Sequence, residues 1–193
     1  MTAKTELRQR MRAVIGRIPT QEAKRQADLV AERLAEWPPY RRAKSVLLYA
    51  ALPGELDTGP MLDRVLADGK RLLLPRCEEG KVMQAVWVED LRLLVSGRFG
   101  IREPSAMLPA VDLQAIDLVL TPGLAFDQAG GRLGRGQGFF DRFLPRTNGI
   151  VAGVAYLEQI LPVFPAGVQE AHDIRMDYLI TACSVHKSER GGD

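Results

Sequence analysis

Glycines, arginines and one aspartate are concentrated in residues 130–144, which read GGRLGRGQGFFDRFL. Glycine tolerates positive φ and lets the backbone approach a ligand closely, so such a loop can turn several N–H groups toward one anion. Arg132 and Arg135 add forked donors that suit phosphate oxygens. Asp141 could hold a divalent cation that bridges those oxygens. This composition predicts a phosphate-binding loop.

The flanking residues indicate where the loop lies in the fold. Residues 117–126 (DLVLTPGLAF) have the branched, apolar composition of a strand, and residues 139–144 (FFDRFL) have apolar residues at helical spacing. The glycines match neither GxxxxGK[ST] nor GxGxxG, so they predict neither a P-loop nor a Rossmann fingerprint. By themselves they fit an ordinary tight surface loop equally well.

Three other groups of charged residues have both a functional and a structural interpretation. Lys4 and Arg8 would share one face of a helix and could reach a triphosphate together, or they could form a solvated cationic face. Glu55 follows an apolar strand and could point into a cleft or belong to a surface turn. Asp173 and Asp177 precede another apolar run, where acids commonly serve as turn and cap residues.

Residues 122–144 (PGLAFDQAGGRLGRGQGFFDRFL) resemble the signature of the 5-formyltetrahydrofolate cyclo-ligase family, also called methenyltetrahydrofolate synthetases. Further segments follow the family pattern in the same order: KTELRQRMR at 4–12, LYAALPGELDT at 48–58, GIREP at 100–104 and HDIRMDYLIT at 172–181. Together these segments span nearly the whole chain.

The resemblance implies ATP- and Mg²⁺-dependent closure of 5-formyltetrahydrofolate, with or without a polyglutamate tail, to 5,10-methenyltetrahydrofolate. ADP and phosphate would be released after transfer of the γ-phosphoryl group to the formyl oxygen. The catalytic residues that it implies are Arg8, Arg135 and Asp141. The ATP-binding residues would be Lys4, Arg8, Arg132, Leu133, Gly134, Arg135, Gly136, Gln137, Gly138, Phe139 and Phe140.

The resemblance also implies substrate and metal ligands. The substrate residues that it implies are Arg8, Ala50, Glu55, Arg135 and Gln137. A carboxylate such as Glu55 suits this role because it can accept paired N–H donors from a pterin edge. The implied metal ligands are Asp141 and Asp177, with Asp173 as the competing choice for the second position. His172 is expected to be structural.

The chain departs from the family pattern inside the loop. Phe139 and Phe140 replace the usual tyrosines, which removes any contact through a phenolic hydroxyl but keeps ring stacking. Arg135 and Gln137 stand where many relatives have tyrosine and glycine. We interpret these changes as tuning of ligand contacts.

The alternation of elements predicts an α/β fold. Expected helices cover residues 2–15, 20–37 (ended by Pro38 and Pro39) and 58–68; expected strands cover 45–51, 70–75, 81–88, 117–126, 150–156 and 178–182. Continuous apolar strands between helices predict a three-layer α/β/α domain with a mainly parallel central sheet. We expect one compact domain over residues 1–187 and a disordered tail over 188–193, with fraying from Ser184, and a long functional loop at 96–109.

Composition limits the remaining function classes. The 193 residues carry a net charge of +2, and 6% are aromatic, which does not favour nucleic-acid binding. No stretch approaches the ~20 apolar residues of a membrane span, and Cys77 and Cys183 match no metal spacing. We therefore expect reduced thiols, a cytoplasmic location and a monomer. Two alternative functions stay open. One is a sugar-phosphate binding or isomerising protein, and the other is a weak RNA-binding module that uses the basic first helix.

Overall fold

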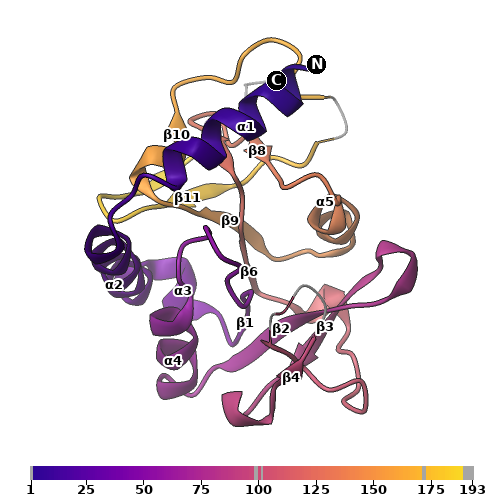
Figure 1. The fold of residues 1–193 in the computed structure, drawn as a ribbon. Coiled ribbons are helices and arrows are strands. Elements are labelled where there is room, and N and C mark those ends of the chain that lie inside the picture. Colours follow the sequence, from indigo (N-terminus) through magenta and orange to yellow (C-terminus); the bar gives the residue numbers. More distant parts are fainter. Residues whose placement is uncertain (1, 98–99, 101, 171–172, 189–193) are drawn as a thin grey trace.

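A seven-stranded sheet forms the centre of the computed structural model, which describes residues 2–97, 100, 102–170 and 173–188 (Figure 1). The strand order is β12-β11-β9-β6-β1-β2-β3. Neighbours from β11 to β2 pair in parallel, whereas β12 and β3 are antiparallel edges. The strands are β1 (Ser45–Leu47), β2 (Arg71–Cys77), β3 (Met83–Trp87), β6 (Leu118–Thr121), β9 (Ile150–Val154), β11 (Tyr178–Ile180) and β12 (Val185–Lys187).

Helices cover both faces of this sheet, which confirms the expected layering. Successive strand residues point to opposite faces, so Val46 packs with the helices on one side and Leu47 packs with α5 on the other. Figure 1 shows α2, α3 and α4 on the side opposite α5. The helices are α1 (Ala3–Ile15), α2 (Thr20–Glu36), α3 (Pro38–Arg42), α4 (Gly59–Ala67) and α5 (Phe139–Phe143).

The strand expected over residues 117–126 is divided in two, and that expectation was wrong. β6 ends at Thr121, and after Pro122 and Gly123 the chain enters β7 (Ala125–Asp127) of a small sheet, ordered β10-β7-β8 with β8 (Arg132–Leu133) and β10 (Ile160–Leu161). The ring of Phe126 is fully buried against Gly123 and Gly153, where an added Cβ would lie 2.6 and 2.4 Å from ring atoms. This packing requires glycine at both positions and turns β7 away from β6.

Other differences concern short elements. Pro38 and Pro39 end α2 as expected but also begin α3, since proline suits the first helical turn. The expected fraying from Ser184 was wrong for Val185–Lys187, which pair with β11, and Ser188 is buried. In the expected loop at 96–109, β5 (Arg102–Glu103) pairs with β4 (Val95–Ser96). His172 and residues 189–193 lie outside the described residues.

Short 3-10 segments complete the connections, at Glu79–Lys81, Leu91–Leu93, Leu113–Ala115, Leu144–Arg146 and Leu157–Gln159. Within the described residues, Cys77 and Cys183 form no disulfide. Among the described helices, none has the length and apolar composition needed to cross a membrane.

We predict that Leu120→Ala lowers the free energy of unfolding by about 2–5 kcal/mol, because it opens a cavity in the central strand β6, where Leu120 is fully buried. Urea denaturation followed by circular dichroism measures this change. Leu93→Ala is the matched control: that side chain is 63% exposed, so its effect should stay below about 0.5 kcal/mol. Equal effects of the two substitutions would contradict the described core.

Candidate active site

A cavity of about 140 Å³ opens at the carboxyl ends of β6, β1 and β2. Ligands bind at this edge in open α/β sheets because the loops that leave parallel strands meet there. The walls come from the segment after β1 (Tyr49, Ala50, Leu52, Glu55), from β2 and β3 (Leu74, Pro75, Cys77, Met83), from β5 (Arg102) and from residues 122–141 (Pro122, Gly123, Arg132, Gly134, Arg135, Gln137, Gly138, Phe139, Phe140, Asp141). The cavity therefore combines an apolar wall with charged groups at its edges.

The glycine-rich segment folds as a short hairpin followed by an open loop. Asp127 closes the hairpin: its Oδ1 accepts a hydrogen bond from the Gly131 amide at 2.7 Å. After β8 the backbone adopts φ of +102° at Gly136 and +69° at Gly138, immediately before α5. Side chains other than glycine are strained in this conformation. The glycines thus form a loop between a strand and a helix, as the sequence predicted.

Arg132 is buried beneath this loop. Its guanidinium donates to the carbonyl of Pro122 at 3.1 Å, forms an ion pair with Asp141 and lies over the Phe140 ring at 5.6 Å. Only 4% of the Arg132 side chain is exposed, against 39% for Asp141. Burial lowers the pKa of Arg132 and attraction from Asp141 opposes that change. Arg132 therefore holds β6, the loop and α5 together instead of presenting a free cation to a ligand.

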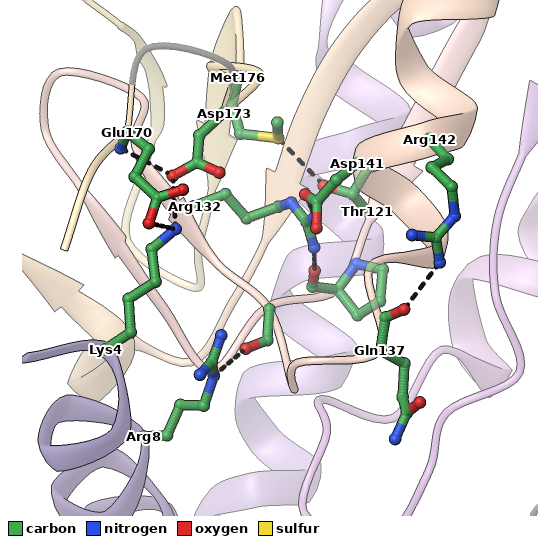
Figure 2. A network of polar contacts seen from close by, with 12 residues as sticks. Lys4, Arg8, Thr121, Arg132, Gln137, Asp141, Arg142, Glu170, Asp173 and Met176 are labelled. Atoms are coloured by element: carbon green, nitrogen blue, oxygen red, sulfur yellow. Dashed lines mark hydrogen bonds and ion pairs between the residues drawn. The ribbon is translucent and has the colours of Figure 1, made fainter. Parts of the chain in front are cut away.

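Helix α1 brings two cations to the same end of the sheet (Figure 2). Arg8 Nε donates to the carbonyl of Gly134 at 2.9 Å, and Lys4 Nζ lies 3.1 Å from both Glu170 Oε1 and Asp173 Oδ2. Burial disfavours the charged form of Lys4, but its hydrogen bonds to these two acids outweigh burial and raise its pKa. Residues from the two ends of the chain thus meet beside the loop.

Glu55 and Arg135 form a second ion pair, at the wall of the cavity that follows β1. Arg135 Nε donates to Glu55 Oε1 at 2.7 Å, and the amide of Leu52 donates to the other carboxylate oxygen at 2.9 Å. The hydroxyl of Tyr156 donates to the Glu55 carbonyl at 3.1 Å. The glutamate is therefore fixed at the cavity wall with its carboxylate already engaged by donors.

The two candidates for the second metal ligand have different environments. Asp177 precedes β11 and its Oδ2 accepts from the Val151 amide at 2.9 Å, in register with the amino end of β9. Asp173 lies beside Lys4, and its charge acts on Arg132 together with that of Asp141 (Figure 2). Asp173 therefore lies near the glycine loop, whereas the carboxylate of Asp177 is held by a backbone amide of the sheet.

Most of the predicted site residues line the cavity. Within the described chain, five do not: Lys4, Arg8, Leu133, Gly136 and Asp177. Lys4 and Arg8 approach the loop from α1, whereas the Leu133 side chain is packed in the core and is 2% exposed, so Leu133 could offer only backbone groups. Tyr49, Met83 and Arg102 line the cavity but were missed as site residues. The sequence signal for Tyr49 and Arg102 was their position in the family-like segments 48–58 and 100–104, whereas Met83 reaches the wall through the pairing of β3 with β2.

Comparisons with known proteins agree on one family. The sequence model of the 5-formyltetrahydrofolate cyclo-ligase family matches residues 1–182. A probable 5-formyltetrahydrofolate cyclo-ligase from Caenorhabditis elegans is 32% identical, covering 92% of this chain and 91% of its own. The Escherichia coli K12 5-formyltetrahydrofolate cyclo-ligase is 35% identical, covering 72% of this chain and 75% of its own. The solution structure of Aquifex aeolicus 5,10-methenyltetrahydrofolate synthetase is 34% identical with a TM-score of 0.86, over 98% of this chain and 95% of that one.

We predict that Arg132→Met lowers the free energy of unfolding by about 2 kcal/mol, because the carbonyl of Pro122 and the Asp141 carboxylate lose a charged donor. Chemical denaturation measures the loss. Arg142→Met is the control on the neighbouring helix: Arg142 donates to the Gln137 carbonyl in an exposed position, so its replacement should cost about 0.5 kcal/mol. A smaller loss for Arg132→Met than for the control would contradict the anchoring role.

Proposed function

Because the chain belongs to the 5-formyltetrahydrofolate cyclo-ligase family, we propose that it converts 5-formyltetrahydrofolate and ATP to 5,10-methenyltetrahydrofolate, ADP and phosphate. One observation carries the proposal for this chain. A single cavity joins Glu55, suited to a pterin edge, to a glycine loop that bears Asp141 and Arg135. Membership of this family identifies the protein as an enzyme. Its nucleotide, its metal ion and the steps of the reaction are our proposal.

The formyl oxygen of the substrate is a poor leaving group, so it must be activated. We propose that it attacks the γ-phosphorus of ATP and displaces ADP, which gives a phosphorylated formyl group. The neighbouring secondary amine then attacks the formyl carbon, phosphate leaves with the former formyl oxygen, and the amine loses its proton. Such a transfer needs alignment and charge stabilisation more than covalent participation by the protein.

The residues at the cavity suit these tasks. Arg8 and Lys4 border the loop from α1 and would meet the phosphate chain, together with the amides around Gly136 and Gly138. Arg135 lies between the loop and Glu55, so its guanidinium can approach the transferring group and the substrate. Phe139, Phe140 and Tyr49 offer ring surface to adenine or pterin.

Asp141 and Asp173 fit a magnesium ion. Mg²⁺ takes oxygen ligands and commonly uses one or two carboxylates with phosphate oxygens and water. The charges of both carboxylates act on the Arg132 guanidinium, so both lie near it (Figure 2). When bound, Mg²⁺ would neutralise charge on the phosphate oxygens. Among the described residues no group of three or more histidine, cysteine or acidic side chains could hold a metal ion by itself.

The apolar wall distinguishes this proposal from the sugar-phosphate alternative. Leu74, Met83 and Phe140 line the cavity, and such side chains suit a planar heterocycle better than a hydroxylated sugar. An RNA-binding role for α1 has less support, because Lys4 and Arg8 point to acids and carbonyls of the same chain. Reaction in the cytoplasm by a monomer stays a prediction.

We predict that Asp141→Asn reduces ATP-dependent formation of the methenyl product by at least about 100-fold, because the metal ion would lose a carboxylate ligand. Glu55→Gln should instead raise the KM for 5-formyltetrahydrofolate by about tenfold, because it weakens pterin binding. The near-ultraviolet absorbance of the methenyl product follows both variants, with and without ATP.

Asp63→Asn is the control for these variants, since Asp63 is exposed on α4, and it should keep wild-type kinetics. The wild-type protein must form product only with ATP and Mg²⁺ present. A folded wild-type sample that forms none under these conditions would overturn the proposed reaction, and phosphorylated sugars would then be the next ligands to test.

We predict that Asp173→Asn raises the Mg²⁺ concentration for half-maximal rate by about tenfold or more, while Asp177→Asn leaves it unchanged. Asp177→Asn should lower Tm by about 2–4 °C, because it weakens the hydrogen bond to the Val151 amide. Magnesium titration of the rate and thermal unfolding separate the two effects. The reverse pattern would assign the metal to Asp177.

A further inference from the structure

Three of the described residues that line the cavity are arginines, and they differ in whether a carboxylate pairs with the guanidinium. Arg132 is paired with Asp141, and Arg135 is paired with Glu55. Arg102 is exposed, and within the described part of the chain no carboxylate lies at ion-pair distance from it. Its Nη2 donates to the carbonyls of Leu91 at 2.9 Å and Leu94 at 3.4 Å. These contacts orient the guanidinium without neutralising it.

The order of the strands gives the position of Arg102 relative to the reacting groups. The glycine loop follows β6 and Glu55 follows β1, whereas β2 and β3 lie progressively farther along the sheet. Arg102 shares the cavity wall with Cys77 and Met83, which are paired in register at the β2–β3 edge. Arg102 therefore lies at the β2–β3 edge of the cavity, beyond the strand β1 that leads to Glu55.

The proposed substrate has its own charges at one end. A folate consists of a pterin, an aminobenzoyl group and a glutamate whose carboxylates are negatively charged. With the pterin at Glu55 and the formyl group toward the loop, the aminobenzoyl group would lie against the apolar wall of Leu74 and Met83. The glutamate would then reach the β2–β3 edge.

We propose that Arg102 binds a carboxylate of this glutamate tail and so selects a substrate with an anionic tail, an assignment that rests on the proposed function. A guanidinium is suited to this task because it stays charged and offers paired donors that match a carboxylate. Because no described carboxylate pairs with Arg102, this cation also gives up no ion pair to the described residues when the ligand binds, in contrast to Arg132 and Arg135.

The experiment compares two ligands and three proteins by titration calorimetry. The ligands are 5-formyltetrahydrofolate and its diamide, in which both tail carboxylates are converted to uncharged amides. Wild type should bind the acid about tenfold more tightly than the diamide, since a charged hydrogen bond is lost. Arg102→Gln, which keeps a donor for the Leu91 carbonyl but removes the charge, should bind both ligands with the weak affinity of the diamide.

Arg92→Gln is the matched control. Arg92 lies between Leu91 and Leu93, is 90% exposed and pairs with Asp90 outside the cavity, so this variant should keep the preference for the acid. Three results would overturn the assignment: an undiminished preference for the acid in Arg102→Gln, an equal loss of affinity for both ligands, or a loss confined to ATP. Turnover is measured on the same samples, and tail-dependent binding without product would refute the proposed reaction while leaving Arg102 as the tail ligand.

Discussion

The buried guanidinium of Arg132 is the interaction on which the geometry of the site depends. It connects the end of β6, through the carbonyl of Pro122, to Asp141 at the start of α5. Such a buried cation is tolerated only when its donors are satisfied, so the loop between these points must close to supply the partners. The glycines make that closure sterically possible, and Asp127 fixes where it begins. One charge thereby couples the strand, the hairpin and the short helix.

Charge balance is a general property of the site. Lys4 faces Glu170 and Asp173, Arg132 faces Asp141, and Arg135 faces Glu55. Each pair keeps two polar side chains at defined positions while no ligand is bound. In the proposed reaction, a metal–triphosphate would exchange some of these partners, with phosphate replacing carboxylate at the cations and Mg²⁺ replacing the cations at the acids. Each lost ion pair would then be replaced by a charged contact of the same kind.

The sequence was sufficient for features that depend on local composition. Apolar runs located the inner strands, and the glycine-rich segment located the loop before α5. The break at Pro122 and Gly123 could not be predicted, because it depends on the packing of Phe126 against Gly153 of another strand. The environments of Asp173 and Asp177 also depend on tertiary contacts, with Lys4 and with the Val151 amide. Arg102 belonged to a recognised segment, yet its place at the cavity becomes visible only from the strand order.

The contact between Lys4 and Asp173 joins residues 169 positions apart in the chain, and this separation has a consequence for synthesis. A polypeptide emerging from the ribosome contains strands β1, β2, β6 and β9 and the glycine loop before Asp173 has been added. The charged end of the site beside α1 is completed only when Asp173 returns to the first helix. Shorter chains lack this set of charged groups, so the proposed binding of a nucleotide would become possible only late in synthesis.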